Sequence, residues 1–206
     1  MTGDMKRTLL AIFAIFLAAI GAAAATPQQI VQRAASKLKA AQSVQAAYTL
    51  TADGHSSQGM LTISGNRFTV AAPGLSSWYD GKTQWTYSQQ MGEVNVVTPT
   101  PDELQQINPF AIISSLGKDY TMTAAKAPKG YSAVSLKARD RHSDITAATV
   151  TFSDATQWPT AIRLTLANRQ TIDIAIDRIT TGGAIPAEYF RFDTRKYPGV
   201  QVVDLR

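Results

Sequence analysis

The sequence predicts a mainly β (α+β) fold in which a strongly curved antiparallel sheet, or incomplete β-barrel, of about 11 strands carries one N-terminal helix and two inserted helices. Three observations support it. Apolar and polar residues alternate with a period of two in many separate segments, turn residues divide these segments at short intervals, and only two stretches have a helical period. A sheet of that many strands curls rather than staying flat.

The first segment is predicted to be a cleaved signal peptide covering residues 1–25. Lys6 and Arg7 precede a short apolar run, residues 9–20, and the small residues Ala23 to Ala25 follow. The run is too short for a stable membrane span and has the order of an export signal. We therefore expect residues 26–206, 181 residues, to form a single exported domain.

Composition limits the class of protein. The chain contains no cysteine, so it has neither a disulfide nor a cysteine that could carry a lipid anchor, and we expect the periplasm as its location. The formal charge is +5, and the basic residues are scattered along the chain. No nucleic-acid-binding surface is expected from this distribution.

A helix is predicted directly after the signal peptide. Thr26 can cap it, Pro27 suits its first position, and Gln29 completes a capping box. Apolar residues then recur at helical spacing, and polar residues fill the other face. The apolar stripe consists of Ile30, Val31, Ala34, Ala35, Leu38 and Ala41.

Strands are predicted from residue 43 onwards, where the period changes to two. The alternation begins at Val44 to Leu50 and returns in five later segments: 68–72, 85–87, 148–152, 162–166 and 172–176. Turn residues separate the strands at Asp53-Gly54, Gly65-Asn66, Asp80-Gly81, 128–130, 141–144, 154–159 and Asn168-Arg169. This pattern is interpreted as a meander with one apolar face and one wet face.

One interruption of the meander has a helical period. It begins with the Pro-rich segment 98–101 and continues through Asn108-Pro109, where a helix can start, to Gly117, where it ends. Phe110, Ile112, Ile113 and Leu116 give this segment an apolar face. Two short helices are therefore expected within the sheet protein.

No catalytic site, metal site or cofactor is expected, so the chain is predicted not to be an enzyme. Ser143 lies beside His142 and Asp144, but adjacent side chains diverge and do not form a catalytic triad. Asp140, His142 and Asp144 would converge on a metal only in a regular strand, whereas a hairpin turn is expected there.

A barrel of this many strands is wider than its side chains need, so an apolar cavity is expected inside it. The residues expected to line the cavity, or to cover it from the helices, are Phe68, Val70, Trp85, Tyr87, Phe110, Ile112, Ile113, Ile30 and Leu38. For each apolar residue taken alone, simple core packing remains the alternative.

Two motifs carry a family resemblance. The hairpin Asp80-Gly81-Lys82 with Trp85 and Tyr87, followed by Asn108-Pro109-Phe110, resembles the periplasmic outer-membrane lipoprotein carrier (LolA-like) family. The order of features, from the N-terminal helix to Phe190-Arg191-Phe192 and Pro198, is similar across nearly the whole exported chain.

The resemblance implies an unclosed barrel with lid helices that takes acylated lipoproteins from an inner-membrane ABC transporter and passes them to an outer-membrane receptor. It also implies that Phe68 lies at the cavity mouth with Val70 beyond it, and we expect a monomer. The family carries an arginine a few residues before this aromatic residue. Here Ser64 and Gly65 occupy that neighbourhood, and Arg67, being adjacent to Phe68, is expected to face the opposite side.

Two other functions stay open at this point. One is a carrier of free or glycosylated lipids, and the other is an envelope sensor that binds lipoproteins or polypeptides. A hydrolase would need a convergent polar cluster, and activity that vanished in a His142→Ala variant would indicate one.

Overall fold

The computed structural model describes residues 25–101, 103, 104, 108 and 119–206. A 12-stranded sheet is accompanied by the helix α2 (Pro27–Ala40). The strands are β1 (Ser43–Ala52), β2 (His55–Ser64), β3 (Arg67–Ala72), β4 (Leu75–Tyr79), β5 (Gln84–Ser88), β6 (Glu93–Val97), β7 (Tyr120–Ala125), β8 (Tyr131–Ala138), β9 (Ile145–Ser153), β10 (Pro159–Leu166), β11 (Thr171–Gly182) and β12 (Gln201–Asp204). Two 3-10 turns, η1 (Ala187–Phe190) and η2 (Thr194–Lys196), precede β12.

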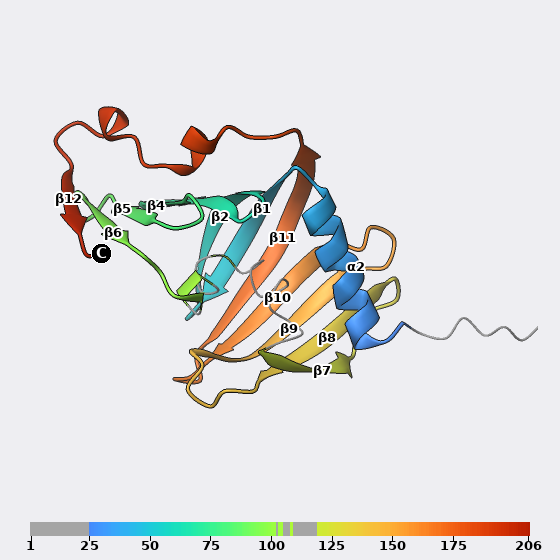
Figure 1. Cartoon of the computed structure of the whole chain (residues 1–206). Coiled ribbons are helices and arrows are strands. Elements are labelled where there is room, and N and C mark those ends of the chain that lie inside the picture. Colours follow the sequence, from blue (N-terminus) through green and yellow to red (C-terminus); the bar gives the residue numbers. More distant parts are fainter. Residues whose placement is uncertain (1–24, 102, 105–107, 109–118) are drawn as a thin grey trace, which may run out of the picture.

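The sheet is curved and open, which confirms the predicted fold class (Figure 1). Its order is β12-β6-β5-β4-β3-β2-β1-β11-β10-β9-β8-β7. Within the described residues β7 and β12 form the two edges, so the sheet does not close into a barrel. The turns predicted from Gly, Asn, Asp and Pro all connect neighbouring strands.

One strand departs from the antiparallel prediction. β12 pairs with β6 in parallel, with Gln201 opposite Glu93 and Asp204 opposite Val96. The chain reaches this position through the C-terminal segment, residues 183–200, which passes over β4 and β5 before it joins β6 (Figure 1). Because the segment crosses the width of these strands, β12 enters the sheet edge from the same end as β6.

A β-bulge bends the centre of the sheet. The pairing of β1 with β11 runs from Ala47 opposite Arg178 to Tyr48 opposite Ile176, which leaves Asp177 unpaired in the ladder. Bulges of this kind bend a strand and increase its twist. The bulge lies between β1 and β11, in the middle of the strand order, and adds to the curvature of the sheet.

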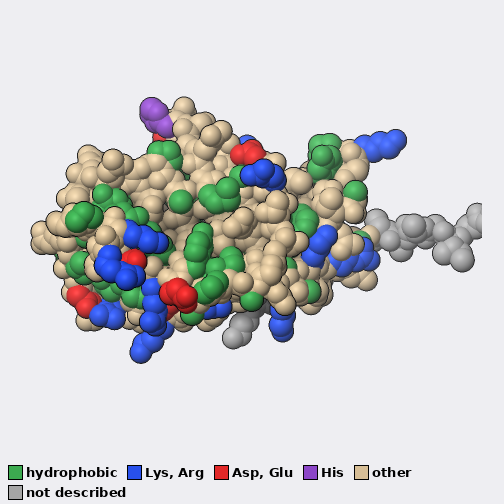
Figure 2. All heavy atoms as spheres, turned by 90° about the horizontal axis from the view of Figure 1, so that it is seen from above, with side chains coloured by type: hydrophobic (Ala, Val, Ile, Leu, Met, Phe, Trp, Pro, Cys, Tyr) green, Lys and Arg blue, Asp and Glu red, His purple; other side chains and the backbone are tan. Residues whose placement is uncertain are grey.

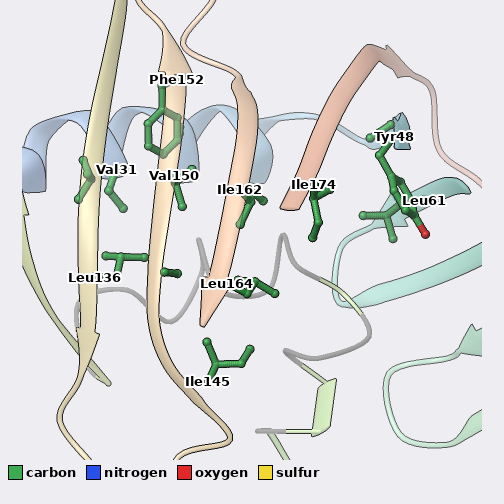
Figure 3. Packing of buried hydrophobic residues seen from close by; sticks show 14 of the residues in the cluster. Val31, Tyr48, Leu61, Leu136, Ile145, Val150, Phe152, Ile162, Leu164 and Ile174 are labelled. Carbon is green, nitrogen blue, oxygen red and sulfur yellow. The ribbon is translucent and has the colours of Figure 1, made fainter. Parts of the chain in front are cut away.

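Helix α2 lies across the concave face. Thr26 caps it through the predicted capping box with Gln29, and Val31 and Ala34 are buried against the sheet. Figure 3 shows Val31 beside the apolar side chains of β8 and β9, including Leu136 and Val150. This core extends over β8 to β11 and continues onto β1, β2 and β3. No helix in the described part of the chain is long and apolar enough to cross a membrane.

Tyr48 occupies its place in the core because Gly59 stands opposite it. The two residues are direct partners of β1 and β2, and a Cβ added to Gly59 would lie 2.3 Å from Tyr48 Cζ. The tyrosine ring therefore covers the space that a side chain at position 59 would use. Burial of this ring also raises the pKa of Tyr48.

We expect the Gly59→Ala variant to lower the free energy of unfolding by about 1–3 kcal/mol, the usual cost of overpacking a core. The added methyl group must displace the end of the Tyr48 ring. The same change in a Tyr48→Ala background should cost much less, because the clash is then gone. Urea denaturation of the four proteins measures this coupling, and additive effects would contradict the contact.

Candidate functional site

An apolar cavity of about 570 Å³ lies between α2 and the concave face of β1 to β4. Single small ligands are usually held in cavities of about 300–1,000 Å³. Its lining residues come from α2 and the residue that follows it, from β1 to β4, from the turn between β2 and β3, and from two later residues: Ala35, Leu38, Lys39, Ala41, Val44, Ile63, Gly65, Asn66, Arg67, Phe68, Tyr79, Leu104 and Asn108. Apolar side chains form most of the wall, and two amides and two basic residues contribute to the lining.

The wall of the cavity is organised around Phe68. This ring packs against Tyr79 with the centroids 5.2 Å apart, and the two residues are direct partners of β3 and β4. Ile63 is the partner of Phe68 on the other side, in β2. Burial first, and then the nearby charge of Asp80, raise the pKa of Tyr79, so its phenol stays neutral at physiological pH.

The residues expected at the site divide into four groups. Phe68 and Leu38 line the cavity, and Val70 and Ile30 pack beside it in the core of the concave face. Phe110, Ile112 and Ile113 lie outside the described residues. Trp85 and Tyr87 lie on the opposite face of the sheet, which corrects the expectation that they share the cavity with Phe68.

The register shows why Trp85 and Tyr87 face away from the cavity. In β4 and β5, Tyr79 pairs with Gln84 and Ser77 with Thr86, so these four residues share the face of Phe68. Trp85 is therefore on the alternate face. Ile63 and Tyr79, which sequence reasoning missed, could have been found as the cross-strand neighbours of Phe68 once the strands were placed side by side.

A second apolar layer covers the outer face of β4 to β6. Tyr197 of the C-terminal segment packs against Trp78 and Tyr87, with centroid distances of 5.8 and 4.7 Å. Phe192 also contacts Trp78, at 5.5 Å. In β6 the side chain of Val94, at 0% exposed, is buried on this same face. Tyr87, which was expected in the cavity, therefore helps to hold the C-terminal segment on the sheet.

Arg191 fixes the C-terminal segment to the β4–β5 hairpin. Its Nε donates to Asp80 Oδ2 at 3.0 Å, while the N–H groups of Lys82 and Thr83 donate to Asp80 Oδ1. Next to this contact the Arg67 guanidinium lies 5.0 Å from the Phe190 ring centroid. Arg67 thus contacts the segment on the outer face. Figure 2 shows charged side chains of both signs gathered over the part of the surface where this segment lies.

Asp80 is held in its ionised form. Its burial opposes ionisation, but the hydrogen bonds from Thr83, Lys82 and Arg191 outweigh that effect and lower the pKa of the carboxyl group. Gly81 permits the tight turn, with φ of +101°, and a Cβ there would lie 2.7 Å from the Asn66 side chain. The Asp-Gly-Lys motif therefore has a structural role in this chain: it forms the tight turn between β4 and β5.

We expect Asp80→Asn to lower the free energy of unfolding by about 1 kcal/mol at pH 7, because Arg191 is largely exposed and its ion pair is screened. A lowered pKa contributes stability above the pKa of the unfolded chain, about 3.9, and loses it as the pH falls through the native value. The difference between variant and wild type should therefore shrink in acid. Denaturation curves at pH 7 and pH 2.5 measure it, with Asp173→Asn, which removes an exposed ion pair to Arg163, as the control.

The residues considered as metal ligands lie in the connection between β8 and β9. No group of three or more His, Asp or Glu side chains in this part of the chain could hold a metal ion. Residues 139–144 form the connection between β8 and β9, and the His142 N–H donates to the Asp140 carboxylate at 2.8 Å. The hairpin turn predicted at this position is confirmed.

Comparison with known proteins places these features in a family. Residues 17–170 match the family described as outer membrane lipoprotein carrier protein LolA. No curated protein matches the sequence. Among solved structures, an uncharacterized conserved protein from Thermus thermophilus superposes with a TM-score of 0.58 at 12% identity, covering 86% of this chain and 98% of that one. This similarity shows a shared fold.

Two further solved structures are less similar. A LolA superfamily protein from Nitrosomonas europaea has a TM-score of 0.45 and 13% identity, covering 83% of this chain and 100% of its own. A putative outer membrane lipoprotein-sorting protein domain from Vibrio parahaemolyticus has a TM-score of 0.48 and 8% identity, covering 78% of this chain and 94% of its own.

Proposed function

Because this chain belongs to the outer membrane lipoprotein carrier protein LolA family, we propose that it is a periplasmic carrier which shelters the acyl chains of lipoproteins and moves them from the inner to the outer membrane. Residues 1–25 act as the export signal, and residues 26–206 form the carrier domain. An inner-membrane ABC transporter supplies the cargo, and an outer-membrane receptor accepts it. The family consists of carriers, so no catalytic step is assigned.

The observation that supports this function best is the apolar cavity beneath α2. Leu38 closes it from the helix, and Phe68 and Ile63 form its wall on the sheet. Hydrocarbon is the ligand that such a wall accepts without unpaired polar groups. Burial of an acyl chain contributes about 0.8 kcal/mol per methylene, so a 16-carbon chain gains on the order of 12 kcal/mol if it is wholly buried.

A carrier that kept all of this free energy would not release its cargo. We propose that part of the gain is offset when α2 moves and its apolar face, including Leu38, leaves the cavity wall. The helix is well suited to this because it is one short element, capped at Thr26, that lies across the sheet. The loaded and empty carrier then differ little in free energy. A partner protein that binds one of these two states slightly better can therefore drive loading or release.

Mass spectrometry of material that co-purifies with the chain from a native periplasm tests the proposal. Acylated peptides or proteins are expected. Free or glycosylated lipids would instead indicate a lipid carrier, and an empty cavity with a bound envelope polypeptide would indicate a sensor. Either of these results would overturn the assignment of lipoproteins as cargo.

A further inference from the structure

Although the basic residues are scattered along the sequence, four of them meet at one end of the sheet, beside α2. Arg33 and Lys37 share one flank of α2, because residues four positions apart face the same side of a helix. Two exposed lysines, Lys126 and Lys129, occupy the turn between β7 and β8. Neither α2 nor this turn contains an acidic residue, and none of the four cations lines the cavity.

Contacts between two turns and the helix hold this surface together. The Asp154 N–H in the turn between β9 and β10 donates to the Gly130 carbonyl in the turn between β7 and β8, at 3.0 Å. Lys37 also reaches the β9–β10 turn. Its Nζ donates to the Thr156 carbonyl at 2.6 Å and lies 5.1 Å from the Trp158 ring centroid. Both turns therefore lie next to α2, at the same end of the sheet (Figure 1).

Few carboxylates oppose the charge of this surface. None of the four cations forms an ion pair with a carboxylate of the described residues. The two turns contain one acidic residue, Asp154, whose carboxylate accepts from Ser132 Oγ at 2.6 Å. Four cations and one carboxylate give the surface a charge of +3, in a chain whose formal charge is +5. At the opposite end of the same strands, the connection 139–144 has two arginines and two aspartates, which cancel.

Two partly exposed aromatic side chains accompany the cations. Tyr131, the first residue of β8, is 43% exposed, and Trp158 is half-buried beside Lys37. Tryptophan and tyrosine rings favour the head-group level of a lipid bilayer, where one end of the ring is apolar and the other is wet. Lysine and arginine side chains are attracted to anionic head groups. A membrane surface with anionic lipids is therefore the partner that suits both kinds of side chain.

We propose that this cationic surface, formed by Arg33, Lys37, Lys126 and Lys129, docks the protein reversibly on an anionic lipid bilayer. The contact is electrostatic, with the charged groups at head-group level. It places one flank of α2 against the lipid, while Leu38 on the same helix lines the cavity. An acyl chain that enters or leaves the bilayer then has a short path to the cavity. The inference goes beyond the proposed function, because the identity of the cargo does not enter it.

Co-sedimentation with lipid vesicles tests this surface. The exported chain, residues 26–206, should bind vesicles of equimolar phosphatidylglycerol and phosphatidylcholine and should not bind phosphatidylcholine alone. Binding should be lost when the salt concentration is raised from about 0.1 M to about 1 M, because the screening length falls from about 10 Å to about 3 Å. The double variant Lys126→Gln/Lys129→Gln should bind at least about tenfold more weakly, since each cation near an anionic surface contributes about fivefold.

The matched control is Lys82→Gln/Lys196→Gln, which removes the same charge from two exposed lysines outside this surface. It should bind anionic vesicles like the wild-type chain, and an equal loss would overturn the proposal by showing that net charge alone causes binding. Binding of polyglutamate but not of vesicles would also overturn it and would indicate an acidic polypeptide as the partner. Displacement of a fluorescent fatty acid should be unchanged in both double variants, because none of these lysines lines the cavity.

Trp158 shows which end of the molecule meets the bilayer. Its fluorescence emission should move to shorter wavelength when anionic vesicles bind, and the Trp158→Phe variant should lose this shift. Trp78 and Trp85 belong to β4 and β5, in the other half of the strand order. A shift that survives in Trp158→Phe would therefore contradict docking through the end of the sheet beside α2.

Discussion

The Leu38→Glu variant is expected to bind acyl chains at least about 100-fold more weakly than the wild-type chain while it remains folded. Leu38 lies in the last turns of α2 and lines the cavity, but its side chain is only partly buried. A carboxylate can therefore reach solvent when the cavity is empty. When the cavity is filled with hydrocarbon, the charge must be desolvated, and a cost of about 2.7 kcal/mol already gives 100-fold.

Displacement of a fluorescent fatty acid measures this effect, and circular dichroism checks the fold. Ser36→Glu is the matched control, because it adds the same charge to an exposed position two residues away on the same helix. It should bind like the wild-type chain. Unchanged affinity in Leu38→Glu would mean that the cavity beneath α2 does not hold the cargo.

The sheet and the N-terminal helix could be predicted because their signals are local. The Thr26 capping box needs only four consecutive residues, and the two-residue period of the strands depends on neighbours in the chain. Turn residues such as Asp53-Gly54 then set the strand boundaries. The curvature followed from the number of strands, although the bulge at Ala47 and Tyr48 that produces part of it has no local signal in the sequence.

The positions of Trp85 and Tyr87 could not be predicted, because alternation identifies two faces without saying which one is inside. In most strands the apolar face is the concave one. In β4 to β6 the relation is reversed, since Tyr197 and the rest of the C-terminal segment cover the outer face. The residues that cover this face lie about 100 positions later in the chain. The sequence of β4 to β6 alone therefore cannot show that their apolar face is the outer one.

The same reversal explains why the polar side chain of Gln84 is buried on the concave face. An aromatic residue at position 85 and polar residues at 84 and 86 suggested a cavity-facing tryptophan, whereas the polar residues face inward. For Arg67 the period-two argument gave only part of the answer, because this residue also contributes to the lining of the cavity. It was expected to face away from Phe68, and its guanidinium does contact Phe190 of the outer layer.

Replacing Val70 with glutamate is expected to lower the free energy of unfolding by at least about 3 kcal/mol at pH 7, the scale for an unpaired buried charge. Val70 is 7% exposed and packs in the core of the concave face, beside Leu61 of β2. Unlike the partly buried Leu38, it is almost fully buried. Loss of cargo in this variant would therefore report unfolding, which is why Leu38 is the better position for testing the cavity.

The pH dependence identifies the cause of this destabilisation. Burial raises the pKa of the introduced carboxyl group, so the native state binds its proton more tightly than the unfolded chain does. The penalty should then grow as the pH rises above the unfolded value of about 4.3 and should shrink below it. Urea denaturation at pH 4 and pH 8 measures both limits. Ala71→Glu, at the next residue on the exposed outer face, should lie near wild type at both, and an equally large loss there would show that β3 tolerates no carboxylate on either face.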